Sequence, residues 1–259
     1  MIGKCPLSLV PLRLEPSDRS EMVSQLLFGE SYQVIDELKG WLLVKVLHDG
    51  YEGWMDKKQS LAPEFNQAAS ENPGTVHVVA GITAPAYPAG SESPVVLCKG
   101  SVLPQLRNNR FSLGGQEYLY ESETREIPAS PQPGNILSTA MEYLHTPYLW
   151  GGRSPFGIDC SGFTQMVFRL CGIALKRDAA IQCQEGEIIS FINEAQPGDL
   201  AFFENAAGNI THTGILTGTG KIIHASGWVR IDPIDHHGIF NPECGQYTHT
   251  LRLVRRMAK

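Results

Sequence analysis

The pattern of hydrophobic and polar residues divides the chain into three parts. Residues 5–60 contain short runs rich in β-forming residues, separated by glycines, and this pattern predicts β-strands. The dipeptide Asp49-Gly50, between the runs LLVKVLH and YEGWM, predicts a hairpin. A second series of short apolar runs covers residues 76–127, where turn signals recur about every ten residues, as is typical of a small barrel.

Two stretches interrupt these patterns. The segment LAPEFNQAASENPG, residues 61–74, loses the alternation and predicts a linker. The segment PASPQPG, residues 128–134, is rich in proline, and the pattern changes after it. The sequence therefore predicts two small all-β domains, at residues 1–62 and 73–128, and a larger domain at residues 133–259.

The third part combines helices and strands. The segment NILSTAMEYL, residues 135–144, predicts one helix. A second helix is predicted by apolar residues at helical spacing that end before a glycine cap, namely Phe163, Met166, Val167, Leu170 and Cys171. The runs LAFF, HTGILTG, KIIHAS and HTLRLV then predict strands. Helices followed by a series of strands indicate an α+β fold.

Cys160 stands where the second helix begins. The N–H groups and dipole at a helix N-terminus stabilise a thiolate, which is the form of cysteine that attacks a carbonyl. Gly157 and Gly162 flank Cys160 and would let a substrate backbone approach it. A single cysteine is more often a small buried apolar residue, and Cys171 and Cys183 are assigned to that class. Cys160 is the candidate nucleophile.

A nucleophile needs a base, and the base needs a group that orients it. His212 and His224 each lie six residues from Gly218, in a segment where Gly218-Thr219-Gly220 predicts a hairpin. The two histidines would therefore face each other on adjacent strands, or lie diagonally if the loop differs by one residue. Alone, such a pair could be a polar cross-strand contact. Together with Cys160 it follows the papain-like order of nucleophile, base and orienting group.

Composition narrows the class of protein. The 259 residues are 42% hydrophobic and 19% charged, with a formal net charge of −6, which is typical of a soluble globular protein. The chain has no basic block, and this argues against nucleic acid or a membrane surface as its main partner. The N-terminal residues lack the pattern of a signal peptide, so we expect a cytoplasmic location unless a leader has been removed.

The six cysteines include no CxxC pair, which favours reduced thiols over a zinc site or a disulfide framework. Four residues near the C-terminus could be drawn as a metal cluster, but they lack a compact pair at ligand spacing: His236, His237, Cys244 and His249. We expect no metal and no cofactor.

The segments YLWGGRSPFGIDCSGFTQMVF, QPGDLAFF, HTGILTGTGKIIHAS and RDAA resemble the NlpC/p60 family of cysteine peptidases, which cleave bacterial cell-wall peptides. The resemblance covers nearly all of residues 135–255 and implies a papain-like α+β catalytic domain. It further implies that Cys160 is the nucleophile, His212 the base and His224 the residue that orients the base. Tyr148 falls on the family's tyrosine near the oxyanion, although an aromatic residue there could also simply pack in the loop.

The two preceding β-domains resemble bacterial SH3-like modules. The whole layout is similar to γ-D-glutamyl-L-diamino acid endopeptidases of murein-peptide recycling, in which the first module helps to close the substrate site and selects a free N-terminal L-alanine. This resemblance implies substrate-binding roles for Glu21, Tyr51, Trp150, Asp159, Ser161 and Asp178. A solvated surface charge at Glu21 and a local ion pair between Asp178 and Arg177 are the alternatives.

The function expected from the sequence is that of a monomeric cysteine endopeptidase acting on a free murein peptide such as L-Ala-γ-D-Glu-diaminopimelate. One alternative is a hydrolase that remodels intact peptidoglycan, which the missing leader and the free cysteines oppose. The other is a non-catalytic wall-binding protein, which the complete set of Cys160, His212 and His224 opposes.

Overall fold

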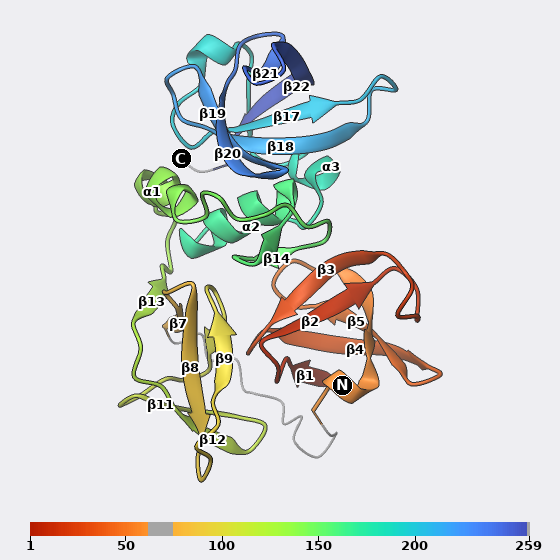
Figure 1. Cartoon of the computed structure of the whole chain (residues 1–259), viewed down its shortest axis with the longest axis vertical. Helices are drawn as coiled ribbons and strands as arrows, with labels where there is room; N and C mark the ends of the chain where they lie inside the picture. The colour runs from red at the N-terminus through yellow and green to blue at the C-terminus, as the bar shows by residue number, and fades with distance from the viewer. Residues whose placement is uncertain (62–74, 258–259) are drawn as a thin grey trace. The chain divides into compact units, whose positions relative to one another are not determined.

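The structure is a computed structural model that describes residues 1–61 and 75–257 (Figure 1). These divide into two compact units, Met1–Ala129 and Ser130–Lys259. The predicted linker, apart from Leu61, lies outside the described residues, and so do the domain boundaries predicted at residues 62 and 73. The two units are described separately below.

The first unit begins with a six-stranded antiparallel sheet in the order β1-β4-β5-β6-β2-β3. A short 3₁₀ helix, Lys57–Gln59, follows the last strand. The predicted hairpin at Asp49-Gly50 is confirmed, because it joins β5 to β6 and Gly50 takes a positive φ of 77°. The strands are β1 (Ile2–Lys4), β2 (Leu9–Arg13), β3 (Met22–Leu27), β4 (Ser31–Leu38), β5 (Trp41–Val46) and β6 (Glu52–Asp56).

The same unit continues with two smaller sheets, in the orders β10-β7-β13 and β11-β12-β8-β9. Phe28, from the turn after β3, is fully buried in the core of these sheets, with its ring 5.8 Å from that of Phe111 and 5.7 Å from that of Tyr118. The first sheet therefore contributes to the core of the next two. The strands are β7 (Val76–Val79), β8 (Thr83–Pro88), β9 (Val95–Cys98), β10 (Val102–Leu103), β11 (Arg110–Leu113), β12 (Gln116–Leu119) and β13 (Thr124–Ile127).

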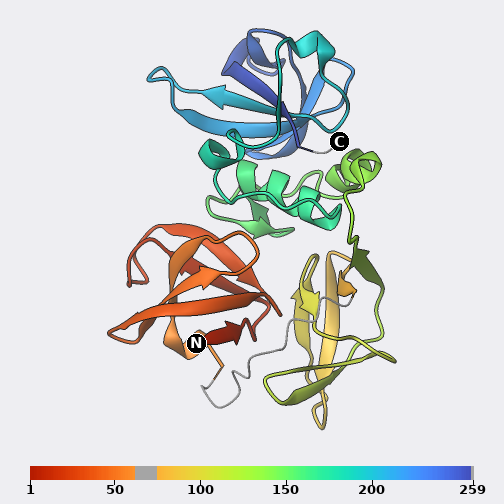
Figure 2. The ribbon, with the colours of Figure 1, turned by 180° about the vertical axis from the view of Figure 1, so that it is seen from behind.

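The second unit is an antiparallel sheet with helices on one side, as the opposite views of Figures 1 and 2 show. Its strands follow the order β16-β22-β17-β18-β19-β20, and β21 pairs with β22. Helix α2 packs against β18 and β19. The sheet strands are β16 (Glu187–Ile189), β17 (Leu200–Glu204), β18 (Ile210–Leu216), β19 (Lys221–Ser226), β20 (Trp228–Pro233), β21 (Gly238–Asn241) and β22 (Gln246–Arg256).

The two helices that the sequence predicts for this unit are present. Helix α2 (Cys160–Leu170) begins at the predicted cysteine and buries all but one of its residues, and Gly172 ends it with a positive φ of 76°. Helix α1 (Ile136–Met141) is shorter than predicted, because residues 142–146 form tight turns that include His145 at a φ of 67°. Sequence reasoning missed the hairpin β14 (Arg153–Ser154) and β15 (Gly157–Ile158), helix α3 (Ala179–Gln182), and the sheet strands β16, β20 and β21.

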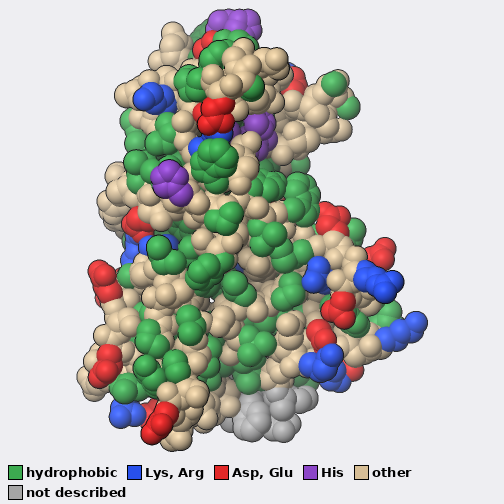
Figure 3. All heavy atoms as spheres, in the orientation of Figure 1, with side chains coloured by type: hydrophobic (Ala, Val, Ile, Leu, Met, Phe, Trp, Pro, Cys, Tyr) green, Lys and Arg blue, Asp and Glu red, His purple; other side chains and the backbone are tan. Residues whose placement is uncertain are grey.

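The described surface carries both signs of charge. On the face shown in Figure 3, lysine and arginine side chains alternate with aspartate and glutamate over the β1–β6 sheet. Within residues 1–61 and 75–257, no helix combines the length and apolar character needed to cross a membrane. No three His, Cys, Asp or Glu side chains of the same residues come together as a set of metal ligands.

Candidate active site

Cys160 is the first residue of α2, and Asp159 is the N-cap. The Asp159 carboxylate accepts a hydrogen bond from the Gly162 amide at 2.7 Å, which fixes the first turn of the helix. A Cβ at position 162 would lie 2.3 Å from the Gly152 carbonyl oxygen, so only glycine lets the preceding loop pack this closely. The Cys160 side chain is thus held in a rigid first turn, with 5% of the residue exposed.

The electrostatic setting of Cys160 favours the neutral thiol when the histidines are uncharged. Burial, together with the nearby Asp159 carboxylate, raises the pKa of Cys160 to about 12. The backbone amide of Thr213, the Arg177 guanidinium and the Ser161 amide act in the opposite direction but do not outweigh burial. The helix start alone therefore does not produce a thiolate here. Ionisation requires a base that takes the thiol proton as the thiolate forms.

A histidine directly precedes the residue whose backbone amide reaches this thiol. The Thr213 amide that acts on Cys160 belongs to β18, and His212 immediately precedes it. Burial, with further contributions from His224 and His249, lowers the pKa of His212 well below its usual value. His212 is thus a neutral imidazole near pH 7, able to accept a proton.

His212 and His224 are hydrogen-bonded, but not in the register predicted first. His224 pairs with Gly214 across β18 and β19, so the expectation that His212 and His224 stand directly opposite is wrong and the diagonal arrangement is observed. His212 Nε2 lies 2.8 Å from His224 Nδ1. A Cβ at position 214 would lie 2.8 Å from the Cβ of His224, so glycine at this position makes room for the diagonal contact.

Two charged residues beyond His224 were missed by sequence reasoning. His224 Nε2 lies 2.9 Å from Oδ2 of Asp232, and Nη2 of Arg230 donates to Oδ1 of Asp232 at 3.0 Å. Both residues lie on β20, where Arg230 pairs with His224 across the turn at Gly227. Equal spacing on the two sides of Gly227 was the available signal. A hairpin that turns at Gly227 places Arg230 opposite His224 and Asp232 diagonal to it.

His249 was considered for a metal cluster, and the structure instead stacks it on His212. The two rings are 4.1 Å apart at an angle of 29°, and Phe203 contacts both. Burial lowers the pKa of His249 to about 4. A neutral aromatic ring therefore covers one face of the His212 imidazole and keeps water from it.

Tyr148 is half-buried beside the cysteine. Burial raises the pKa of its phenol, and the proximity of Cys160 and Asp159 adds to the effect. The Tyr148 amide donates to the Gly227 carbonyl at 2.8 Å, which ties the loop before Cys160 to the β19–β20 turn. A neutral phenol at this position is a hydrogen-bond donor close to the thiol.

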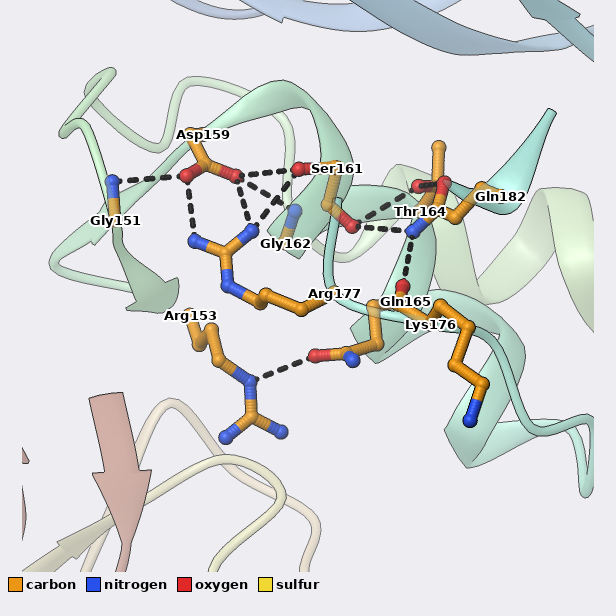
Figure 4. Close-up of polar contacts among 10 residues, drawn as sticks. All are labelled: Gly151, Arg153, Asp159, Ser161, Gly162, Thr164, Gln165, Lys176, Arg177 and Gln182. Carbon is orange, nitrogen blue, oxygen red and sulfur yellow. Dashed lines mark hydrogen bonds and ion pairs between the residues drawn. The ribbon is translucent and has the colours of Figure 1, made fainter. Parts of the chain in front are cut away.

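Asp159, the residue before Cys160, forms a buried ion pair with Arg177 (Figure 4). Arg177 Nη1 donates to Asp159 Oδ1 at 3.0 Å and to Ser161 Oγ at 2.9 Å, while the Gly151 amide donates to Asp159 Oδ2 at 2.8 Å. Arg177 thus pairs with Asp159, and Asp178 adds to its electrostatic environment, as the alternative of a local ion pair had it. Sequence reasoning did not single out Arg177 as a member of this cluster.

The other predicted substrate-binding residues are distributed over both units. Trp150 is exposed in the loop before β14, and Asp178 is the half-buried residue before α3. Glu21 is exposed immediately before β3, and Tyr51 packs against the core of the β1–β6 sheet.

Two parts of the chain match known protein families. Residues 145–246 match the NlpC/P60 family, and residues 12–59 match the bacterial dipeptidyl-peptidase Sh3 domain. A relative in Bacillus subtilis (strain 168), named gamma-D-glutamyl-L-lysine dipeptidyl-peptidase, is 34% identical over 78% of this chain and 71% of its own length. Dipeptidyl-peptidase 6 of Lysinibacillus sphaericus is 31% identical over 83% of this chain and 84% of its own.

Solved structures show the same fold. An NlpC/P60 family protein from Bacillus cereus superposes with a TM-score of 0.85 over 100% of both chains, at 24% identity. An NlpC/P60 endopeptidase from Photobacterium damselae subsp. piscicida has a TM-score of 0.72 over 97% of this chain and 70% of its own, at 17% identity. With a buried cysteine at a helix start, a histidine pair on the sheet and relatives matched over most of their length, the chain belongs to the NlpC/P60 family and is a cysteine peptidase with an N-terminal SH3-like domain.

Proposed function

We propose that the protein hydrolyses the γ-D-glutamyl-L-diamino acid bond of murein peptides that carry a free N-terminal L-alanine. The observation that supports this most directly is the hydrogen-bonded His212–His224 pair, one residue from the amide that reaches the Cys160 thiol. The names of relatives in Bacillus subtilis and Bacillus cereus, gamma-D-glutamyl-L-lysine dipeptidyl-peptidases, support the substrate class.

In the proposed reaction, Cys160 is the nucleophile and His212 the base. His212 takes the proton of the Cys160 thiol while sulfur bonds to the γ-carbonyl carbon of D-glutamate, which gives a tetrahedral oxyanion. Because the Cys160 pKa is raised by burial, proton transfer and attack are coupled. His224 orients His212 through the 2.8 Å contact between their ring nitrogens. The Tyr148 phenol and the Cys160 amide are the proposed oxyanion donors.

The oxyanion then collapses. The carbon–nitrogen bond to the diamino acid breaks, and its amine leaves with the proton carried by His212, which leaves a thioester on Cys160. Water attacks the thioester after His212 removes a water proton. The Cys160 sulfur then leaves as thiol, regaining a proton through His212, and L-Ala-D-Glu is released with a free γ-carboxylate. No cofactor takes part in this sequence.

We further propose that carboxylates recognise the free amine of the substrate. An ammonium that leaves water needs an opposite charge and hydrogen-bond acceptors. Glu21, Asp178 and the Tyr51 hydroxyl are the proposed partners of this amine, with Trp150, Asp159 and Ser161 lining the site. Asp159 and Ser161 already accept hydrogen bonds from Arg177, so they would line the site as members of this cluster.

We infer that the catalytic unit is papain-like, because the candidate nucleophile begins a helix and the candidate base lies on a strand of the sheet. We propose that the chain comprises an SH3-like domain at residues 1–62, a second one at 73–128 and the catalytic domain at 133–259. The small sheets of residues 76–127 support the second assignment. All six cysteines are free thiols, which supports the proposal of a monomer acting in a reducing cytoplasm.

Mass spectrometry of the products tests the proposed function. L-Ala-γ-D-Glu-diaminopimelate and its lysine counterpart are incubated with the protein, in parallel with intact sacculi. The proposal expects L-Ala-D-Glu and the free diamino acid from the soluble peptides. Cleavage of sacculi alone would indicate a remodelling hydrolase, and binding to sacculi without any cleavage would indicate a wall-binding protein.

Two cysteine variants provide the control. Cys160→Ala is expected to abolish product formation. Cys171→Ala changes a buried cysteine at the other end of α2 and is expected to retain activity. Retained activity in Cys160→Ala would show that the nucleophile lies elsewhere.

A further inference from the structure

The chain of hydrogen bonds that starts at His212 does not end at His224. His224 Nε2 lies 2.9 Å from Asp232 Oδ2, and Arg230 reaches both carboxylate oxygens, with Nη2 3.0 Å from Oδ1 and Nε 2.7 Å from Oδ2. His224 is 1% exposed and Asp232 is 3% exposed, so both lie inside the unit. A buried carboxylate enclosed by a histidine and an arginine is costly to desolvate and is not needed to hold a hairpin together.

The positions of the protons follow from this enclosure. Burial opposes ionisation of Asp232, but the hydrogen bond from His224 and the contact with Arg230 together hold its pKa below the usual value. An ionised carboxylate only accepts hydrogen bonds, so His224 Nε2 carries a hydrogen. In a neutral His224, Nδ1 is therefore an acceptor, and the hydrogen in the 2.8 Å contact belongs to His212 Nε2. His212 Nδ1 is then left with a lone pair.

We propose that Asp232 is a positioning residue of the reaction, which sets the hydrogen positions of His224 and His212 and balances the charge that the two rings gain when His212 takes the Cys160 proton. This inference rests on the proposed base role of His212. The S–H bond of Cys160 breaks and an N–H bond forms at His212 Nδ1. The resulting positive charge is shared with His224 by movement of the hydrogen between the two rings, next to the Asp232 carboxylate.

The groups packed around the two rings make Asp232 their nearest negative charge. From β17 comes the Phe203 ring and from β22 the neutral His249 ring, and the Cys160 thiol of α2 contacts the amide of Thr213, the residue after His212. From β20 come Asp232 and Arg230, and Glu243 contacts Arg230 on the solvent side. Removing the carboxylate therefore destabilises the protonated pair, and removing the guanidinium stabilises it.

Two substitutions exploit these opposite effects. In Asp232→Asn, loss of the negative charge lowers the pKa of the histidine pair, so the acid limb of kcat/KM moves to lower pH. In Arg230→Gln, loss of the positive charge raises that pKa, so the acid limb moves to higher pH. The plateau of Asp232→Asn is expected to fall about 10- to 100-fold, less than the roughly 10⁴-fold loss when the residue directly on the base is changed in a Ser-His-Asp triad.

Asp199→Asn is the matched control, because Asp199 is also a buried carboxylate paired with an arginine, Arg256, at 2.9 Å and 2.8 Å. It contacts neither histidine, and its variant is expected to keep both the plateau and the acid limb of the wild type. The proposal would be overturned if the acid limb of kcat/KM stayed in place in Asp232→Asn and Arg230→Gln, or if it moved in the same direction in both variants.

Nitrogen-15 NMR of the histidine rings tests the same inference without substrate. The full-length wild type is expected to show hydrogen on Nε2 of both His212 and His224, and Asp232→Asn is expected to change the form of His224. Hydrogen on Nδ1 of neutral His224 in the wild type would contradict the proposal. If the wild type cleaves no murein peptide, the proposed function fails, while the NMR result still decides the role of Asp232.

Discussion

The two ring nitrogens of His212 and of His224 have different partners, and this difference predicts unequal effects of substitution. His212 Nε2 contacts His224, and the remaining nitrogen is the one available for a proton. In His212→Gln no group can accept that proton, so kcat/KM is expected to fall by about 10²- to 10⁴-fold. In His224→Gln the amide can still bond to His212, and more activity should remain.

Steady-state kinetics of the two variants on the soluble tripeptide measure the difference. His237→Gln, at an exposed histidine, serves as the control. Greater residual activity in His212→Gln than in His224→Gln would show that the two roles are exchanged.

The low pKa of His249 predicts a pH dependence of stability. Burial lowers this pKa from 6.5 to about 4, and the pKa of His212 is lowered in the same direction. Between these pH values the unfolded chain binds protons that the folded protein does not, so the free energy of unfolding falls as pH falls from 6.5 to about 4. Below pH 4 the contribution of His249 is fully lost.

Thermal unfolding measured between pH 7 and pH 4 tests this prediction. His249→Phe keeps a ring against His212 but does not titrate, so its Tm should fall less over this range than that of the wild type. An equal fall in both proteins would assign the pH dependence to other groups.

At the level of single elements, the start of α2 depends on one buried ion pair. Asp159 caps the helix and balances Arg177, whose side chain is 2% exposed. Asp159→Ala is expected to cost about 3–5 kcal/mol, since it leaves a buried charge without its partner and removes a cap worth about 0.5–2 kcal/mol. Arg177→Met alone leaves the carboxylate uncompensated. The double variant removes both charges and should be more stable than the sum of the single losses predicts.

Urea unfolding of the wild type and the three variants, each as the full chain, completes this double-mutant cycle. Losses that simply add would mean that the Asp159–Arg177 contact contributes little to stability. Because Asp159 is also proposed to line the substrate site, unfolding and not activity is the quantity to compare.

The same elements show which features the sequence predicts and which it does not. The helix at Cys160 and the strands β17, β18, β19 and β22 were predicted, because local periodicity determines them, whereas β16, β20 and β21 were not. The register between β18 and β19 could not be predicted, because one residue in the turn decides whether His212 and His224 lie opposite or diagonal to each other. The pair between Arg177 and Asp159 was not predicted, since chain order does not show that the residue before Cys160 turns its carboxylate toward Arg177. Asp232 was missed because its partner lies one hairpin away.

At the scale of the whole chain, sequence patterns separate modules more readily than they show how modules share a core. The two β-rich parts of the first unit looked independent on either side of a linker. Phe28 from the first part is nonetheless buried among Phe111 and Tyr118 of the second, and the Val102 amide donates to the Phe28 carbonyl at 2.8 Å. A single aromatic residue in a turn belongs to no periodic pattern, so the sequence could not predict this contact.

The final prediction concerns the role of the first unit in choosing substrates. Glu21, exposed before β3, and Tyr51, in the β5–β6 hairpin region, are proposed to hold the free amine of the substrate together with Asp178. Loss of one hydrogen bond to a charged group costs about 1.5–3 kcal/mol, so Glu21→Ala should lower kcat/KM for L-Ala-γ-D-Glu-diaminopimelate roughly 10- to 100-fold. Glu15→Ala, at an exposed glutamate in the same β2–β3 connection, should not.

N-acetylation of the peptide makes the complementary change in the substrate. The acetyl group removes the positive charge and adds bulk where the carboxylates are proposed to enclose the amine, so the wild type should not cleave the acetylated peptide. Glu21→Ala should then discriminate less between the free and the acetylated peptide than the wild type does. Equal cleavage of both peptides by the wild type would mean that the first unit does not select for the amine, and would favour action on the intact wall.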